Sequence, residues 1–111
     1  MTARQQQIEA LRHAIAVYRR AITEGRHGQC RDWHLRVAND AEHTLAKHTG
    51  APAPKQGPTY HQKLSLTDAL REVYRELAFV AHEIGFSPLR DRQRAAELLG
   101  VTSEQYRRVT S

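Results

Sequence analysis

Hydrophobic residues recur at helical spacing in two stretches of the N-terminal half. In residues 2–24 the apolar positions follow alternating steps of three and four, which places them on one face of a helix. Thr2 can cap this helix and Gly25 can end it. A second stripe runs from residue 30 or 31 to 48 and meets Gly50, so the glycine-containing turn between the two helices predicts an αα-hairpin. The apolar positions are Ile8, Leu11, Ile15, Tyr18 and Ile22 in the first helix, and Trp33, Val37, Ala41 and Leu45 in the second.

The third stretch, residues 66–84, has the clearest pattern in the chain. Its apolar residues step by four and three throughout, Ser65 or Thr67 can cap its start, and Gly85 can end it. The segment before it, residues 50–64, contains most of the prolines and predicts a linker or a long loop. The apolar positions of the third helix are Leu66, Leu70, Val73, Leu77, Val80 and Ile84.

The last part of the chain predicts two further helices and completes an all-α fold. Ser87 and Pro88 fit the N-cap and the first position of a fourth helix that runs to Leu99. A short fifth helix begins at Thr102 or Ser103, and no strand-like alternation occurs anywhere. The expected organisation is about five helices: a helical hairpin in residues 1–49, a Pro-rich connection in 50–64 and a three-helix unit in 65–111.

Composition narrows the class of partner. The chain has 111 residues and a formal net charge of +5, which favours a polyanionic partner over an acidic substrate. Cys30 is the only cysteine, so an internal disulfide is excluded and a reducing compartment fits best. The N-terminal residues lack the apolar run of a signal peptide, and no stretch approaches the length of a membrane span. We therefore expect a cytoplasmic protein that does not bind membranes.

The C-terminal stretch has the features that a helix-turn-helix requires. Ala96 is small enough to let the two helices approach, Gly100 can adopt the positive φ of the turn, and apolar residues follow at Val101, Tyr106 and Val109. The segment QRAAELLGVTSEQYRRV, within about residues 92–111, resembles the helix-turn-helix of phage and bacterial repressors. The resemblance covers about 20 residues of the chain and implies sequence-specific binding to double-stranded DNA, as in a small dimeric transcriptional regulator.

The resemblance also implies which side chains meet DNA. A recognition helix lies in the major groove, so its outward residues would contact bases and phosphates. Arg107 and Arg108 lie one step apart, about 100° around the helix, so one can reach a guanine edge while the other takes a phosphate. The fourth helix would supply contacts to the DNA backbone. The groove-facing residues would be Thr102, Ser103, Glu104, Arg107 and Arg108, and the backbone contacts Arg90, Arg92 and Arg94.

A single such unit binds DNA weakly, so a homodimer is expected. The N-terminal hairpin can supply the interface or can simply complete the bundle, and the pattern fits both. Trp33, the only tryptophan, is a candidate interface anchor as well as a candidate core residue. The residues expected at an interface are Ile8, Leu11, Ile15, Tyr18 and Trp33.

Two other classes of function also fit. A small basic helical protein can be a phage- or mobile-element-encoded adaptor or inhibitor that binds a protein of a host nucleic-acid-handling complex. It can also be a subunit that binds the nucleic-acid backbone in a nucleoprotein assembly. His27, Cys30 and His34 have the chemistry of zinc ligands, but their spacing matches no zinc motif. No catalytic constellation is found, so we expect neither an enzyme nor a required metal or cofactor.

Overall fold

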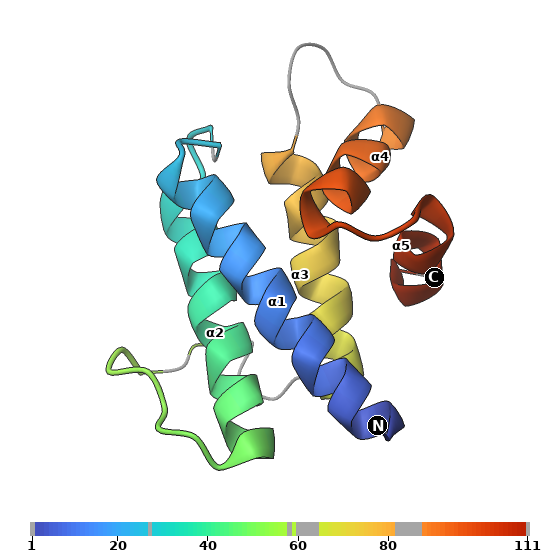
Figure 1. Ribbon diagram of the computed structural model, residues 1–111. Helices are drawn as coiled ribbons and strands as arrows, with labels where there is room; N and C mark the ends of the chain where they lie inside the picture. Colours follow the sequence, from blue (N-terminus) through green and yellow to red (C-terminus); the bar gives the residue numbers. More distant parts are fainter. Residues whose placement is uncertain (1, 27, 58, 60–64, 82–87, 111) are drawn as a thin grey trace.

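A computed structural model describes residues 2–26, 28–57, 59, 65–81 and 88–110. These residues form five α-helices and no strand, which confirms the predicted all-α class (Figure 1). The helices are α1 (Ala3–Thr23), α2 (Arg31–Thr49), α3 (Leu66–Val80), α4 (Pro88–Leu99) and α5 (Ser103–Thr110).

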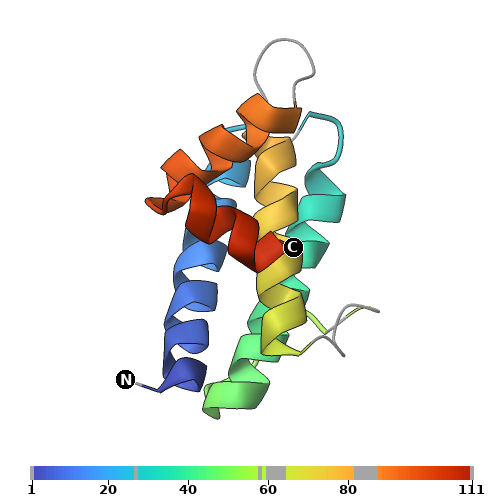
Figure 2. The ribbon, with the colours of Figure 1, turned by 90° about the vertical axis from the view of Figure 1, so that its right-hand side faces the viewer.

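The helices pack around α3. The first three lie side by side as a bundle, and α4 and α5 cover the side of α3 that the bundle leaves open (Figures 1 and 2). One hydrophobic cluster contains residues of all five helices, and α3 contacts each of the other four. The predicted boundary at residues 50–64 stays a prediction. α3, which follows that boundary, packs on α1 and α2 before it as well as on α4 and α5 after it. Buried members of the cluster include Leu11, Val37, Leu77, Leu99 and Tyr106.

The helix ends follow local chemistry that is visible in the sequence. Thr2 and Gln5 form a capping box at the start of α1, and the Ser65 hydroxyl accepts a hydrogen bond from the Asp68 backbone N–H at 3.2 Å. Gly50 ends α2 with a φ of 73°. The expected stop for α1 at Gly25 is also close, since the helix ends at Thr23. α3 ends earlier than the predicted residue 84, because the helix stops at Val80 and Ala81 is its C-cap. Ile84, Gly85 and the predicted Ser87 cap lie outside the described residues.

Part of the Pro-rich connection is tied to α2 by buried polar groups. Asp40 is fully buried, and its carboxylate accepts hydrogen bonds from the Thr59 hydroxyl and, at 2.8 Å, from the Thr59 backbone N–H. The Asn39 amide donates to the carbonyl oxygens of Gln56 and Gly57 at 3.4 and 3.2 Å. His43 Nε2 lies 2.7 Å from the same Gln56 oxygen. These bonds hold Gln56, Gly57 and Thr59 against the helix, although the sequence alone predicts a linker or a long loop.

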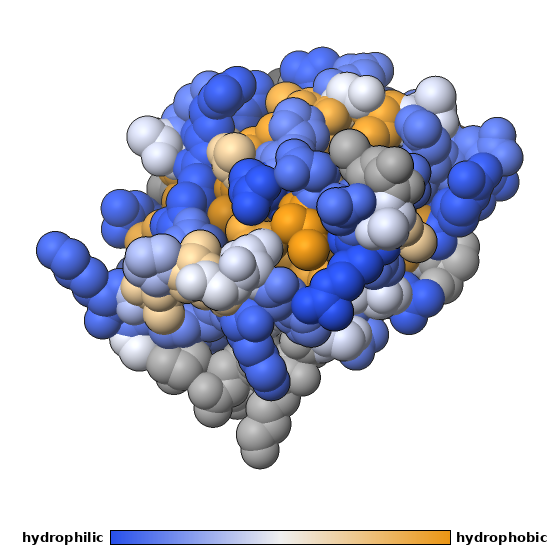
Figure 3. Space-filling view, turned by 60° about the horizontal axis from the view of Figure 1, so that its bottom comes forward, coloured by the Kyte–Doolittle hydropathy of each residue, from blue (hydrophilic) through white to orange (hydrophobic). Residues whose placement is uncertain are grey.

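One face of the protein can be described by the hydropathy of its side chains. Figure 3 shows the face at the bottom of Figure 1, where hydrophilic side chains surround a few hydrophobic ones. Among the residues that the structure describes, the exposed large hydrophobic side chains are Trp33, Phe79 and Leu89. No helix in the described part is both long and apolar enough to cross a membrane.

Replacing Gly100 by alanine is expected to lower the free energy of unfolding by about 1–2 kcal/mol. Gly100 has a φ of 73°, where an L side chain is strained, although a Cβ there would meet no atom within 4 Å. The measurement is denaturant unfolding. Gly57→Ala is the control, because its Cβ also meets open space but its φ lies outside the left-handed region. An equal loss in both variants would contradict the backbone explanation.

Candidate nucleic-acid interface

The turn between α4 and α5 is closed by hydrogen bonds on both sides. At the end of α4, the backbone N–H of Gly100 donates to the Glu97 carbonyl at 3.1 Å, and that of Val101 to the Ala96 carbonyl at 3.0 Å. This pair of bonds is a Schellman motif, which needs the positive φ of Gly100. The short turn therefore sets the angle between the two helices through local geometry.

The start of α5 is capped in the same local way. The Thr102 hydroxyl accepts from the Gln105 backbone N–H at 3.0 Å, and the Gln105 side-chain oxygen accepts from the Thr102 backbone N–H at 2.8 Å. This reciprocal arrangement is a capping box. The Thr102 side chain thus has a structural role, in addition to the DNA contact that the resemblance implies.

The inner face of α5 docks on α3 through a pair of tyrosines. Tyr106 stacks on Tyr74, with ring centroids 5.5 Å apart and an interplanar angle of 13°. Its hydroxyl donates a 2.8 Å hydrogen bond to the Tyr74 carbonyl. Burial raises the pKa of Tyr106 to about 12, so the hydroxyl keeps its donor proton at neutral pH.

A second contact between α3 and α5 is a hydrogen bond of 3.1 Å that Arg71 Nε donates to the Val109 carbonyl. Tyr74 and Arg71 were not singled out in the sequence, because neither is part of the α3 stripe of apolar residues.

The helices present the expected residues outward. Ala96 is buried in the hydrophobic core cluster, whereas Val101 and Val109 are half-buried. On the opposite surface every residue of α5 and its cap that was expected to face DNA is exposed. These exposed residues are Thr102, Ser103, Glu104, Arg107 and Arg108.

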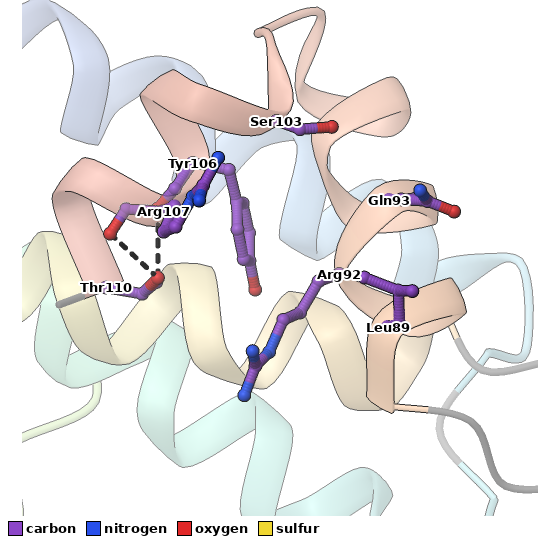
Figure 4. A pocket seen from close by; sticks show the side chains of 7 residues that line it. All are labelled: Leu89, Arg92, Gln93, Ser103, Tyr106, Arg107 and Thr110. Carbon is purple, nitrogen blue, oxygen red and sulfur yellow. Dashed lines mark hydrogen bonds between the residues drawn. The ribbon is translucent and has the colours of Figure 1, made fainter.

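A cavity of about 370 Å³ lies between α4 and α5 (Figure 4). Arg92 comes to it from α4 and Arg107 from α5, with the Tyr106 ring drawn between them in Figure 4. Gln93 and Ser103 add polar groups to its wall. Two arginines from different helices therefore share one concave surface, which suits an anion with several oxygen atoms.

The other candidate arginines lie in different surroundings. Arg108 pairs with Glu104 at 3.4 Å along α5, and both side chains are exposed. Arg90 and Arg94 line a second, smaller cavity of about 150 Å³ together with Asp91 and Glu97. The structure thus brings together Arg92 and Arg107 and places Arg90 and Arg94 beside carboxylates on another part of α4.

The expected interface residues of the hairpin are mostly internal. Leu11 and Tyr18 are fully buried and Ile15 is 5% exposed, in contact with the chain's own core. A second copy cannot reach them in this fold, so their burial corrects the prediction for these three residues. Ile8 is half-buried, and only Trp33 is clearly exposed. For the α1 seam, the alternative in which the hairpin completes the bundle is therefore favoured.

Comparisons with known proteins identify no relative of this chain. No protein-family model matches the chain, and searches of curated proteins and of solved structures find no match. Within the described ranges, no group of three or more His, Cys, Asp or Glu side chains is arranged to hold a metal ion. His27, one of the residues considered for zinc, lies outside those ranges.

Proposed function

We propose that the protein binds double-stranded DNA through α5 and the adjoining face of α4, as a small dimeric transcriptional regulator. The observation that carries the proposal is the division of α5 into two faces. Tyr106 is buried on α3, while Ser103 and Arg107 stay exposed beside Arg92 of α4. A helix held in this way can enter the major groove with its polar face outward.

The two arginines of the cavity suit different parts of DNA. Arg107 is on the outer face of α5, where a bidentate guanidinium can pair with the O6 and N7 atoms of a guanine. Arg92 is on the neighbouring helix and would take a phosphate, with Ser103 at the start of α5 as a further phosphate donor. In this arrangement phosphate contacts position α5, and Arg107 supplies the sequence preference.

Glu104 and Arg108 are compatible with the same surface. Their ion pair is exposed, and such pairs stabilise a protein by only about 0–1 kcal/mol. Arg108 can therefore exchange Glu104 for a phosphate at little cost. The released carboxylate would be able to accept a hydrogen bond from a cytosine amino group.

The test is selection of bound sequences from random duplex DNA, followed by affinity measurements at two salt concentrations. We expect a palindromic site, since a dimer reads two half-sites whose spacing reports its geometry. Arg107→Ala/Arg108→Ala is expected to weaken binding to that site by about 10–100-fold, because each good base contact contributes about 1–3 kcal/mol.

The control is Arg12→Ala/Arg20→Ala, which removes the same charge from exposed positions of α1. It should retain most of the affinity and the preferred sequence. Salt-sensitive binding without a preferred sequence, equally weakened in both double variants, would indicate backbone binding instead. Absence of binding at physiological salt would refute the proposal and favour an adaptor that binds a protein.

A further inference from the structure

A third cavity, of about 680 Å³ and larger than the two described above, lies where the turn between α1 and α2 meets the C-terminal half of α3. Its volume falls in the range of small-molecule sites. Trp33 and His34 come to it from α2, Glu76 and Phe79 from α3, and Arg26 from the turn. In Figure 1 the α1–α2 turn and α5 lie on different sides of α3, so this cavity is separate from the candidate DNA surface.

A polar network joins three helices at the floor of this cavity. The His34 side chain is nearly buried, and its Nδ1 lies 2.6 Å from the Tyr18 hydroxyl and 3.4 Å from Glu76 Oε2. The Trp33 indole N–H donates to the same Glu76 oxygen at 3.3 Å. Glu76 is therefore held in position by contacts from α2, and this residue is part of the cavity wall.

Two carboxylates, those of Glu72 and Glu76, act on the Tyr18 end of this network. Burial raises the pKa of Tyr18, and the charges of Glu76 and Glu72 raise it further. Both carboxylates are therefore close enough to act on the buried Tyr18 hydroxyl. Arg26, the basic residue of the wall, pairs with Glu24 at 3.8 Å. The charged side chains of the described cavity wall are therefore Glu76 and Arg26, and Arg26 already has a carboxylate partner.

Two aromatic side chains in the cavity wall are open to solvent. Trp33 is 39% exposed and Phe79 is 64% exposed. These are two of the three large hydrophobic side chains that the described part of the chain leaves at its surface, and both line this one cavity. The faces of aromatic rings attract cations, and the attraction adds to that of a nearby carboxylate.

We propose that this cavity is a binding site for a small organic cation of the alkylammonium class. Trp33 and Phe79 would contact the methyl or methylene groups of the cation, and Glu76 would face its charge. The site does not depend on the proposed DNA binding, because none of its residues belongs to α4 or α5.

The test uses choline as the probe and 3,3-dimethylbutan-1-ol as its uncharged counterpart of the same shape. Binding is followed by the fluorescence of Trp33, the only tryptophan, with ionic strength held constant by sodium chloride. We expect a saturable change with choline and affinity about ten-fold weaker for the alcohol. Equal affinity for the two probes, or no saturable change with choline, would overturn the proposal.

Three variants separate the contributions of charge and shape. Glu76→Gln should weaken choline binding about ten-fold and leave the alcohol unchanged, whereas Phe79→Ala should weaken both probes. Because Phe79 is largely exposed, its truncation keeps the fold intact even if Glu76→Gln does not. Leu89→Ala, a truncation at a similarly exposed site outside the cavity, should change neither affinity. Unchanged choline binding in Phe79→Ala would contradict the site.

Discussion

Replacing Leu77 by alanine is expected to lower the free energy of unfolding by about 2–5 kcal/mol. Leu77 is fully buried in α3, the helix that contacts all four others. Its truncation removes apolar contacts and leaves a cavity that rigid neighbouring helices fill only in part. The loss is measured by denaturant unfolding. Leu89→Ala, at a position that is 68% exposed, is the control and should change stability by less than about 0.5 kcal/mol.

The same experiment tests whether the chain unfolds as one unit. Trp33 fluorescence follows α2, and backbone amide signals follow α4 and α5. Because α3 belongs to the core of both parts, we expect coincident transitions with both probes, shifted together in Leu77→Ala. Two separate transitions would instead support a boundary within residues 50–64, between a hairpin and an independent C-terminal unit.

Replacing Tyr106 by alanine is expected to detach α5 from the rest of the protein. Tyr106 is the only buried residue of this eight-residue helix, and its truncation removes the stacking on Tyr74 and the hydrogen bond to the Tyr74 carbonyl. Loss of a buried aromatic side chain costs about 3–5 kcal/mol, and a helix this short is not stable alone. Amide hydrogen exchange should therefore accelerate throughout α5 and remain slow in α1 and α2.

The control for this prediction is Tyr106→Phe, which keeps the ring and removes only the hydroxyl. It should cost about 1 kcal/mol and keep α5 docked. If the DNA proposal holds, Tyr106→Ala should lose the selected site and Tyr106→Phe should retain it. Unchanged amide protection of α5 in Tyr106→Ala would contradict the anchoring role of this residue.

α3 carries residues of both surfaces discussed above. The α4–α5 surface depends on the docking of Tyr106, whereas the α1–α2 cavity depends on Glu76, one residue before Leu77. The same helix thus supports both surfaces. Substitutions such as Arg107→Ala and Phe79→Ala affect exposed side chains, so their effects on binding can be separated from effects on folding.

The sequence by itself determined the five helices and most of their ends, although α3 stops at Val80 and not at the predicted residue 84. A repeat of three and four residues specifies a helix with one apolar face, and caps such as Thr2, Ser65 and Gly100 act within one turn of the chain. These are local interactions, so neighbouring residues suffice to recognise them. The polar face of α5 was predictable for the same reason, because the position of Tyr106 defines which residues lie opposite.

Only the tertiary structure decided what covers each apolar face and which distant polar groups meet. The α1 seam fits a dimer interface or an internal core, and its burial against α2 and α3 is what places Leu11 and Tyr18 inside the chain. The placement of Arg92 and Arg107 in the wall of one cavity, and the contact between His34 and Glu76 in another, involve residues of different helices. Such contacts depend on the crossing angles and rotations of packed helices. Those are set by the fit of many side chains at once, which a one-dimensional pattern does not contain.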